Sequence, residues 1–513
     1  MSAFPQKGLV RAVRGAFASA VLMSALTATT AMAGDATLID FGASPKASQA
    51  VTVNGNTVTI VQGGTYRLSG KADGSQLVVN CGDQPLTLIF DNLQLTSGAG
   101  AAIDIRAAGD VEIQLAAGSD NLLADVKGSN LPAGSDANAT LYSKADLKIT
   151  GAENARLAVI GEREDAIVSK DDLDIRKLEL AIDAADEGIR GKDSVDIRDS
   201  RISIQAGGDA IKSDNTENEE KGFVHVEGSR LMIKAGDDGI QGVRAVDIVD
   251  SRIRIEESNE GIEGRFITFH SGQIYVVSKD DAVNVSEKKA ASKEEEGLGS
   301  KLSSMWQGRG KGGGGHGKAI DGKVTIINAD IFLKSGGDGL DSNGHAEMQG
   351  GRLIVDGPLS RGDGYIDVDG DFKLSGGYLL ATGSSGMAQT PSDTSTQPII
   401  QVNLDTPITA GQHFKVIDTD GTVVLDYPAP ADFQSLTLSA PELKLEHTYK
   451  VMIDDQPVTD LTLASLITRH GEAGRGGPRG DRGKKPWWDF NGKDRPPRDG
   501  ERPPHDDDHH QDS

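Results

Sequence analysis

Acidic side chains return at regular intervals along the middle of this 513-residue chain, each inside the phrase acidic–small–aliphatic. The phrase occurs at Asp165-Ala166-Ile167 and Glu187-Gly188-Ile189, and again from Asp209, Asp238, Glu260, Asp281 and Asp338. Carboxylate oxygens are the ligands that calcium prefers, and calcium binds them at about 2.3–2.6 Å. The pattern therefore predicts a row of carboxylates that can hold calcium ions.

The interval between copies of the phrase indicates the element that positions them. Successive phrase acids up to Asp363 are 22, 22, 29, 22, 21, 57 and 25 residues apart. The interval of 29 contains the polar stretch 216–221, and the interval of 57 contains a Gly-, Lys- and Glu-rich insert at about 286–318. Without these two stretches a period of about 22 residues remains, and periods of this length are typical of solenoids.

Short alternating runs within each period indicate strands. Val195-Asp196-Ile197 is followed by Ile202-Ser203-Ile204, so apolar and polar residues alternate as they do in strands with one buried face. Three short strands and three turns fit one period, whereas a propeller blade needs roughly 40 residues. We expect an all-β chain that folds as a parallel β-helix, right-handed by the general rule for parallel crossovers.

The N-terminus has the features of an export signal. Basic residues within 1–14 precede an apolar run at about 16–26, and Ala31-Met32-Ala33 is typical of a cleavage site. The apolar run is shorter than the roughly 20 residues that a membrane span needs. We expect a signal peptide over 1–33 that is cut after Ala33, and hence a secreted protein, either periplasmic or extracellular.

The remaining chain divides by composition. We expect the β-helix over 34–390, with first coils that lack the phrase and a flexible insert at about 286–318. Longer alternating runs and turn signals predict a small β region over 397–468. Gly, Pro, Arg, Asp and His dominate 470–513, which predicts a disordered tail.

The charge balance excludes some classes of partner. Lys and Arg number 53 against 77 Asp and Glu, so the net charge is −24, which argues against nucleic-acid binding because that needs a basic face. The charge suits an anionic partner only if a divalent metal bridges the two. The single cysteine excludes a disulfide scaffold, and no later apolar run predicts a membrane span. The sequence does not indicate an oligomeric state.

The candidate metal ligands are acids that the solenoid would stack. Residues one coil apart lie about 4.8 Å apart, where like charges repel by roughly 1–4 kcal/mol. Calcium bound between the acids of two successive coils would relieve this repulsion. Magnesium suits such a site less, because it demands tighter geometry. The candidate ligands are Asp186, Glu187, Asp209, Asp214, Asp237, Asp238, Asp280 and Asp281. The alternative is that these acids cap turns, since Asp-Gly and Asp-Ala are ordinary turn dipeptides.

Several longer motifs resemble a known family. Asp165–Leu173, Gly208–Asn215, Gly337–Gly344 and Gly350–Pro358 resemble, in this order, the bacterial secreted family of carbohydrate-binding right-handed β-helices. That family was once filed as a domain of unknown function and is similar in fold to family 9 polysaccharide lyases. The resemblance covers about 37–390 and implies binding of acidic plant polysaccharide, notably polygalacturonate, and of cellulose, with calcium bound to the helix.

The position of the aromatic residues bears on the ligand. Trp306, Trp487 and Trp488 all lie in the insert or the tail, so the folded part has no Trp platform for stacking on cellulose. Uronate binding is therefore favoured over cellulose binding. We expect a non-catalytic, calcium-binding protein for acidic polysaccharide, with a polysaccharide lyase and a structural or adhesive solenoid as alternatives.

The lyase alternative needs a base beside the metal. Lys170, Lys192, Lys212 and Lys279 lie near the phrases, and a lysine with a lowered pKa can act as a base. A row of carboxylates should raise the pKa of these lysines, which works against that role, so no catalytic residue is assigned.

Overall fold

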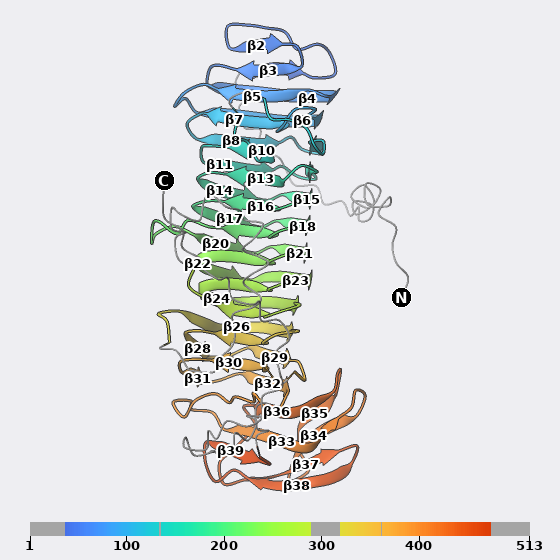
Figure 1. Cartoon of the computed structure of the whole chain (residues 1–513), viewed down its shortest axis with the longest axis vertical. Coiled ribbons are helices and arrows are strands. Elements are labelled where there is room, and N and C mark those ends of the chain that lie inside the picture. Colours follow the sequence, from blue (N-terminus) through green and yellow to red (C-terminus); the bar gives the residue numbers. More distant parts are fainter. Residues whose placement is uncertain (1–35, 133–134, 289–318, 361, 473–513) are drawn as a thin grey trace, which may run out of the picture.

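The computed structural model describes residues 36–132, 135–288, 319–360 and 362–472. These residues form strands and turns, with no helix among them. Most strands belong to one sheet that winds into a parallel solenoid of about 13 turns (Figure 1). The predicted all-β parallel solenoid is thereby confirmed. The predicted signal peptide over 1–33 lies outside the described residues, as do 289–318 of the predicted insert and 473–513 of the predicted tail.

Each coil contributes one strand to each of three parallel ladders. The first ladder contains the strands that begin at or follow the acidic phrase, together with the corresponding strands of the earlier coils, which lack the phrase. It runs through β3 (Thr57–Ile60), β5 (Gln76–Asn80), β7 (Ile103–Ala107), β10 (Ala139–Ser143), β13 (Asp165–Ser169), β16 (Ile189–Gly191), β19 (Ile211–Ser213), β22 (Ile240–Val249), β24 (Ile262–Val277), β25 (Val283–Val285), β27 (Leu340–Ser342) and β30 (Ile366–Val368).

The second ladder follows the first along every coil. It runs through β1 (Thr37–Asp40), β4 (Gly64–Asp73), β6 (Leu86–Thr96), β8 (Val111–Leu115), β11 (Leu147–Gly151), β14 (Asp172–Arg176), β17 (Ser194–Arg198), β20 (Phe223–Glu227), parts of β22 and β24, β26 (Lys323–Lys334), β28 (His345–Met348) and β31 (Phe372–Leu374).

The third ladder completes the coil and leads into the next acidic phrase. It runs through the ends of β4 and β6, then β9 (Asp120–Ala124), β12 (Arg156–Gly161), β15 (Glu179–Ala184), β18 (Arg201–Ala206), β21 (Arg230–Lys234), β23 (Ser251–Glu257), the ends of β24 and β26, β29 (Arg352–Asp356) and β32 (Tyr378–Gly383).

The aliphatic residue of the phrase belongs to the core. Ile167, Ile189 and Ile211 are Cα partners on adjacent coils, and each is 0% exposed. Full burial stabilises such a side chain by about 1.5–3 kcal/mol relative to exposure. Val283 is the Cα partner of Leu340, so the first ladder keeps its register between the coils on either side of the insert.

Two antiparallel elements close the ends of the solenoid. At the N-terminal end β2 (Val51–Asn54) pairs with β3. At the other end β36 (Phe433–Ser439) pairs antiparallel with β32 and with β33 (Ile399–Ile408), and β39 (Ile467–His470) lies parallel to β33. Four further strands form a separate antiparallel sheet in the order β35 (Val423–Pro428), β34 (His413–Asp418), β37 (Thr448–Ile453) and β38 (Gln456–Thr462). No helix in the described segments is long and apolar enough to cross a membrane.

Candidate functional site

The acidic phrases occupy one corner of the solenoid, the turn between the third strand of one coil and the first strand of the next. We call this turn the acidic corner. Glu187 lies in the turn from β15 to β16, and Asp209 lies in the turn from β18 to β19. Because Ile189 and Ile211, two residues after these acids, are Cα partners, the phrase acids of successive coils stack as predicted.

The second position of the phrase is small because the neighbouring backbone lies against it. At Gly188 an added Cβ atom would lie 2.7 Å from the carbonyl oxygen of Ala210, which is too close. The methyl groups of Ala166 and Ala210 are accommodated at 0% exposure. Alanine in place of glycine at these positions therefore leaves the turn intact.

Several phrase aspartates use one oxygen to hold the next coil. In each case Oδ1 accepts a hydrogen bond from a backbone N–H of the following acidic corner. The four bonds are Glu187 to Asp165 at 3.2 Å, Asp238 to Asp209 at 2.9 Å, Asp338 to Asp281 at 2.7 Å and Gly364 to Asp338 at 2.5 Å. These aspartates therefore cap turns, as the alternative interpretation expects. The hydrogen bond uses Oδ1 alone, so the other carboxylate oxygen can accept from, or bind, a different group.

Basic side chains of the protein itself neutralise part of the acidic corner. Lys212 Nζ lies 2.6 Å from Asp209 and 3.0 Å from Glu187, so it bridges two coils. Burial alone would lower the pKa of Lys212, but these two carboxylates raise it above its usual value. On the preceding coil Arg190, the Cα partner of Lys212, lies 2.5 Å from Asp214. The early coils thus carry their own counter-ions.

Carboxylates gather in five groups of three among the described residues. In each group one carboxylate oxygen per residue lies within 4.8 Å of the others. Four groups lie at the acidic corner, and the fifth lies at the turn between the first and second strands. The four are Asp165–Asp186–Glu187, Asp209–Asp237–Asp238, Asp238–Glu260–Glu263 and Asp281–Asp338–Asp341, and the fifth is Asp146–Asp171–Asp172.

Protons relieve part of the repulsion within these groups. Burial and a hydrogen bond with Glu187 raise the pKa of Asp165 to about 9. Burial and the charge of Asp209 raise the pKa of Asp238 to about 10. A metal ion at either position has to displace a proton, so its binding is coupled to pH.

The group Asp281–Asp338–Asp341 fits a hard divalent cation best. All three side chains are buried, at 5%, 4% and 7% exposure. Burial raises the pKa of Asp338 to about 7, with the charge of Asp281 adding to the shift and the N–H of Gly364 opposing it. The donor set consists of carboxylate oxygens alone, which suits calcium and not zinc or copper.

Six of the eight predicted metal ligands belong to these groups. Asp186 and Glu187 lie with Asp165; Asp209, Asp237 and Asp238 form a group of their own; and Asp281 lies with Asp338 and Asp341. The structure does not bring the other two into a group among the described residues. Asp214 is held by Arg190, and Asp280 is exposed.

A second row of residues lies three positions after the phrase acids from Glu187 to Asp338, and the sequence did not reveal it as a row. These residues are Cα partners on the first ladder, in the order Arg190, Lys212, Gln241, Glu263, Asn284 and Asp341. The row changes from basic to acidic along the solenoid, and it supplies Glu263 and Asp341 to the carboxylate groups. The fixed spacing to the phrase was the signal that could have identified it.

No aromatic side chain among the described residues is fully exposed as a stacking platform. Tyr66, Tyr142, Tyr365 and Tyr449 are fully buried, and no aromatic side chain is among the exposed large hydrophobic residues. The half-buried ring of Tyr275 lies between Phe332, with ring centroids 5.1 Å apart, and the guanidinium of Arg254, at 4.2 Å. Polar and charged groups therefore dominate the surface that a ligand meets.

Comparisons with known proteins relate most of the solenoid to one family. Residues 54–357 match the family described as carbohydrate-binding domain-containing protein. A relative of that description from Acetivibrio thermocellus is 32% identical over 128 residues, which are 24% of this chain and 44% of the relative. The chain thus aligns with less than half of that relative's length. A solved structure described as a polysaccharide lyase-like protein from C. thermocellum, a gadolinium derivative, has a TM-score of 0.41 and 30% identity, over 44% of this chain and 93% of the other.

Proposed function

Because the chain belongs to the family of carbohydrate-binding domain-containing proteins, we propose that it is a non-catalytic protein that binds acidic polysaccharide with the help of calcium. The match over residues 54–357 is the observation that carries the carbohydrate part of this proposal, since it spans most of the solenoid. The lack of an exposed aromatic platform among the described residues supports a charged ligand over cellulose.

Calcium is assigned to the acidic corner of the later coils. Asp281, Asp338 and Asp341 would hold the ion through carboxylate oxygens, since they are buried together and one oxygen of each lies within 4.8 Å of the others. Bound calcium would supply a positive centre for a uronate carboxylate on a chain whose net charge is −24. At the earlier coils Lys212 already stands between Asp209 and Glu187, which makes an ion there less favourable.

Export belongs to the same proposal. A leader over 1–33 that is cut after Ala33 would deliver the protein to the periplasm or the extracellular space, where it would meet such polysaccharides.

Affinity electrophoresis tests the proposal. The protein is run through gels that contain polygalacturonate, a neutral cellulose derivative or no polymer, each with calcium or with a chelator. We expect retardation by polygalacturonate, stronger with calcium, and little retardation by the neutral polymer. Equal mobility in every gel would contradict the proposed function.

One observation supports a polysaccharide lyase as the second candidate. The pKa of Lys170 is lowered by burial and by the charge of Arg190, opposite to the direction expected from a row of carboxylates. Its Nζ lies 5.7 Å from the ring centroid of Tyr142, and a lysine with a lowered pKa can act as a general base. Ultraviolet absorbance of an unsaturated uronate, formed from polygalacturonate by the protein and not by K170M, would favour the lyase.

A further inference from the structure

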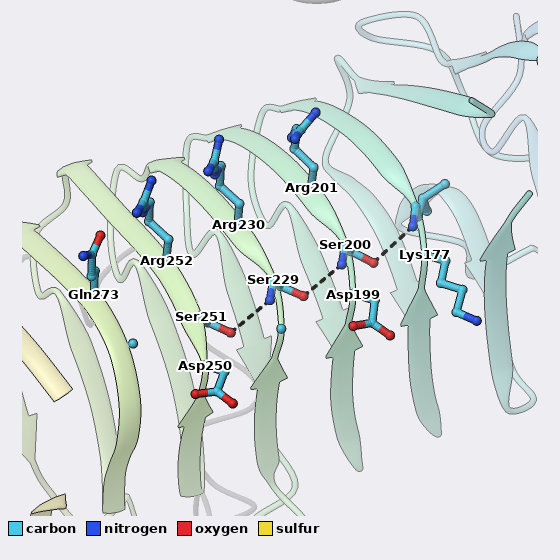
Figure 2. A pocket seen from close by; sticks show the side chains of 13 residues that line it. Lys177, Asp199, Ser200, Arg201, Ser229, Arg230, Asp250, Ser251, Arg252 and Gln273 are labelled. Carbon is cyan, nitrogen blue, oxygen red and sulfur yellow. Dashed lines mark hydrogen bonds between the residues drawn. The ribbon is translucent and has the colours of Figure 1, made fainter. Parts of the chain in front are cut away.

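A groove of about 620 Å³ runs along a different corner, the turn between the second and third strands of each coil. Three arginines on the third ladder line it, and Figure 2 shows them side by side on successive coils. Arg201 is the Cα partner of Arg230, and Arg230 is the partner of Arg252. We call this feature the arginine groove. Because parallel strands lie about 4.8 Å apart, three guanidinium groups share a strip of roughly 10 Å.

A row of buried serines fixes the spacing of these arginines. Each arginine follows Ser200, Ser229 or Ser251, which are 4%, 3% and 2% exposed. The hydroxyl of Ser229 accepts the backbone N–H of Ser200 at 3.0 Å, and that of Ser251 accepts the N–H of Ser229 at 3.1 Å. Each hydroxyl also donates to a carbonyl of its own turn, at 2.7–2.8 Å. The serine hydroxyls thus form their hydrogen bonds within the protein. They fix the positions of the arginines, and the arginines are the groups that can contact a ligand.

The three arginines have no ion-pair partner among the residues that the structure describes. Most other arginines of the described residues form ion pairs, and two neighbouring strands of the second ladder show the contrast. Arg176 lies 2.6 Å from Asp174, and Arg198 lies 2.8 Å from Asp196. Stacked guanidinium groups without carboxylates repel one another, and an anion placed along the row would relieve that repulsion.

The opposite side of the groove carries acceptors. Asp199 and Asp250 line it across the serine row from the arginines (Figure 2). Asp250 accepts the hydroxyl of Ser271, and Asp199 is exposed. Guanidinium groups on one side bind carboxylate or sulfate with two parallel hydrogen bonds, and carboxylates on the other side accept sugar hydroxyls. Both sets of groups repeat along the solenoid axis, as the units of an extended polysaccharide do.

We propose that the arginine groove is a calcium-independent binding site for an extended polysaccharide that carries a carboxylate or sulfate on successive sugars. The proposal rests on the proposed function for the general class of ligand, and it adds a site at a corner separate from the acidic corner. Charge complementarity supports this occupant, since Arg201, Arg230 and Arg252 form no ion pair among the described residues and could bind the anionic groups of the sugars, while Asp199 and Asp250 could accept the sugar hydroxyls. A nucleic-acid backbone lacks such a row of hydroxyls and is disfavoured beside these two aspartates.

Two matched double variants test the site. R201Q/R230Q removes two adjacent unpaired arginines, and R176Q/R198Q removes two adjacent arginines that are paired with aspartates. Binding is measured with the whole protein in chelator, using polygalacturonate, a sulfated polysaccharide, a neutral polysaccharide and single-stranded RNA. Melting temperatures of both variants check the fold, because all four side chains are at least partly exposed.

We expect binding of an anionic polysaccharide to persist in chelator and to weaken with salt. R201Q/R230Q should reduce the affinity at least tenfold, and R176Q/R198Q should change it less than twofold. Preference for polygalacturonate or for the sulfated polymer identifies the anionic group.

Other outcomes overturn the site. Equal binding by R201Q/R230Q and the wild type, tighter binding of RNA than of any polysaccharide, or no binding in chelator would each do so. If calcium-dependent binding to polygalacturonate survives while binding in chelator is absent, the arginine groove fails and the proposed function stands. If no polysaccharide binds under either condition, both fail.

Discussion

The Oδ1 atom of Asp209 accepts a hydrogen bond from the backbone N–H of Asp238 at 2.9 Å, so one carboxylate closes the turn of the next coil. The other oxygen of Asp209 lies 2.6 Å from Lys212 Nζ. At 2% exposure the side chain has almost no access to water, so its loss would leave the N–H of Asp238 without an acceptor and Lys212 with Glu187 alone.

Replacing Asp209 with alanine should lower the free energy of unfolding by about 1–3 kcal/mol, because a buried donor loses its acceptor. Asp237, its exposed neighbour in the same group, is the matched control, and D237A should change stability by no more than about 0.5 kcal/mol. Urea unfolding of both variants measures the difference. Equal stability of the two variants would show that the hydrogen bond to Asp238 contributes nothing.

Removing Lys212 should leave Glu187 and Asp209 without their shared cation. We expect K212M to lose about 3 kcal/mol of unfolding free energy, since one partner of a largely buried ion pair is removed. The same variant should gain more in melting temperature from calcium than the wild type does, because the ion can replace the lost charge. K234M, at an exposed lysine, is the control. An unchanged calcium response in K212M would speak against an electrostatic role for Lys212.

The elevated pKa values predict how stability depends on pH without metal. Burial raises the pKa of Glu260 from 4.5, and that of Asp338 from 3.8, to about 7 in each case. Their contribution is complete below about pH 4 and is lost as the pH rises through 7, because the unfolded chain releases these protons first.

The melting temperature in chelator should therefore fall between about pH 5 and pH 8. Each group contributes a slope of about 1.4 kcal/mol per pH unit between its two pKa values. Glu187, whose pKa is lowered to about 2 by its contacts with Asp165 and Lys212 in spite of burial, should not contribute in this window. E260Q/D338N should make the fall less steep, and the slope that remains comes from groups such as Asp165 and Asp238, whose pKa values of about 9 and 10 lie above this window. A melting temperature that rises across this interval would contradict the assignment.

Chelation should lower the melting temperature at neutral pH, and calcium should restore it more effectively than magnesium at equal concentration. A free ion a hundredfold above its dissociation constant would stabilise the fold by about 2.7 kcal/mol. D281N/D338N should remove most of this response, and D209N/D238N should remove less, because Lys212 already neutralises Asp209. If chelator leaves the melting curve unchanged, the acidic corner is a row of turn caps alone.

The repeat made most of the solenoid predictable. Ile167, Ile189 and Ile211 recur at the coil period with alternating neighbours, and they stack in the core as that pattern predicts. Subtracting the long insert from the spacing restored the period of about 22 residues, and Val283 and Leu340, on either side of the insert, are Cα partners on adjacent coils. Local spacing was sufficient here because each coil contacts mainly its neighbours.

The partners of the acids could not be predicted from spacing. Whether Asp209 binds calcium, a backbone N–H or Lys212 depends on the reach of side chains across coils. The arginine groove had a signal in the recurring Ser-Arg pairs at 200, 229 and 251. Whether these arginines form ion pairs depends on which carboxylates lie nearby, and the register of the coils determines that.

Calorimetric titration of the protein with oligogalacturonides of defined length, in calcium and again in chelator, tests the central claim most directly. Binding of acidic polysaccharide predicts saturable heat in calcium, weaker binding in chelator and no heat from a neutral oligosaccharide of equal length. The absence of binding heat from oligogalacturonides under both conditions would contradict the account.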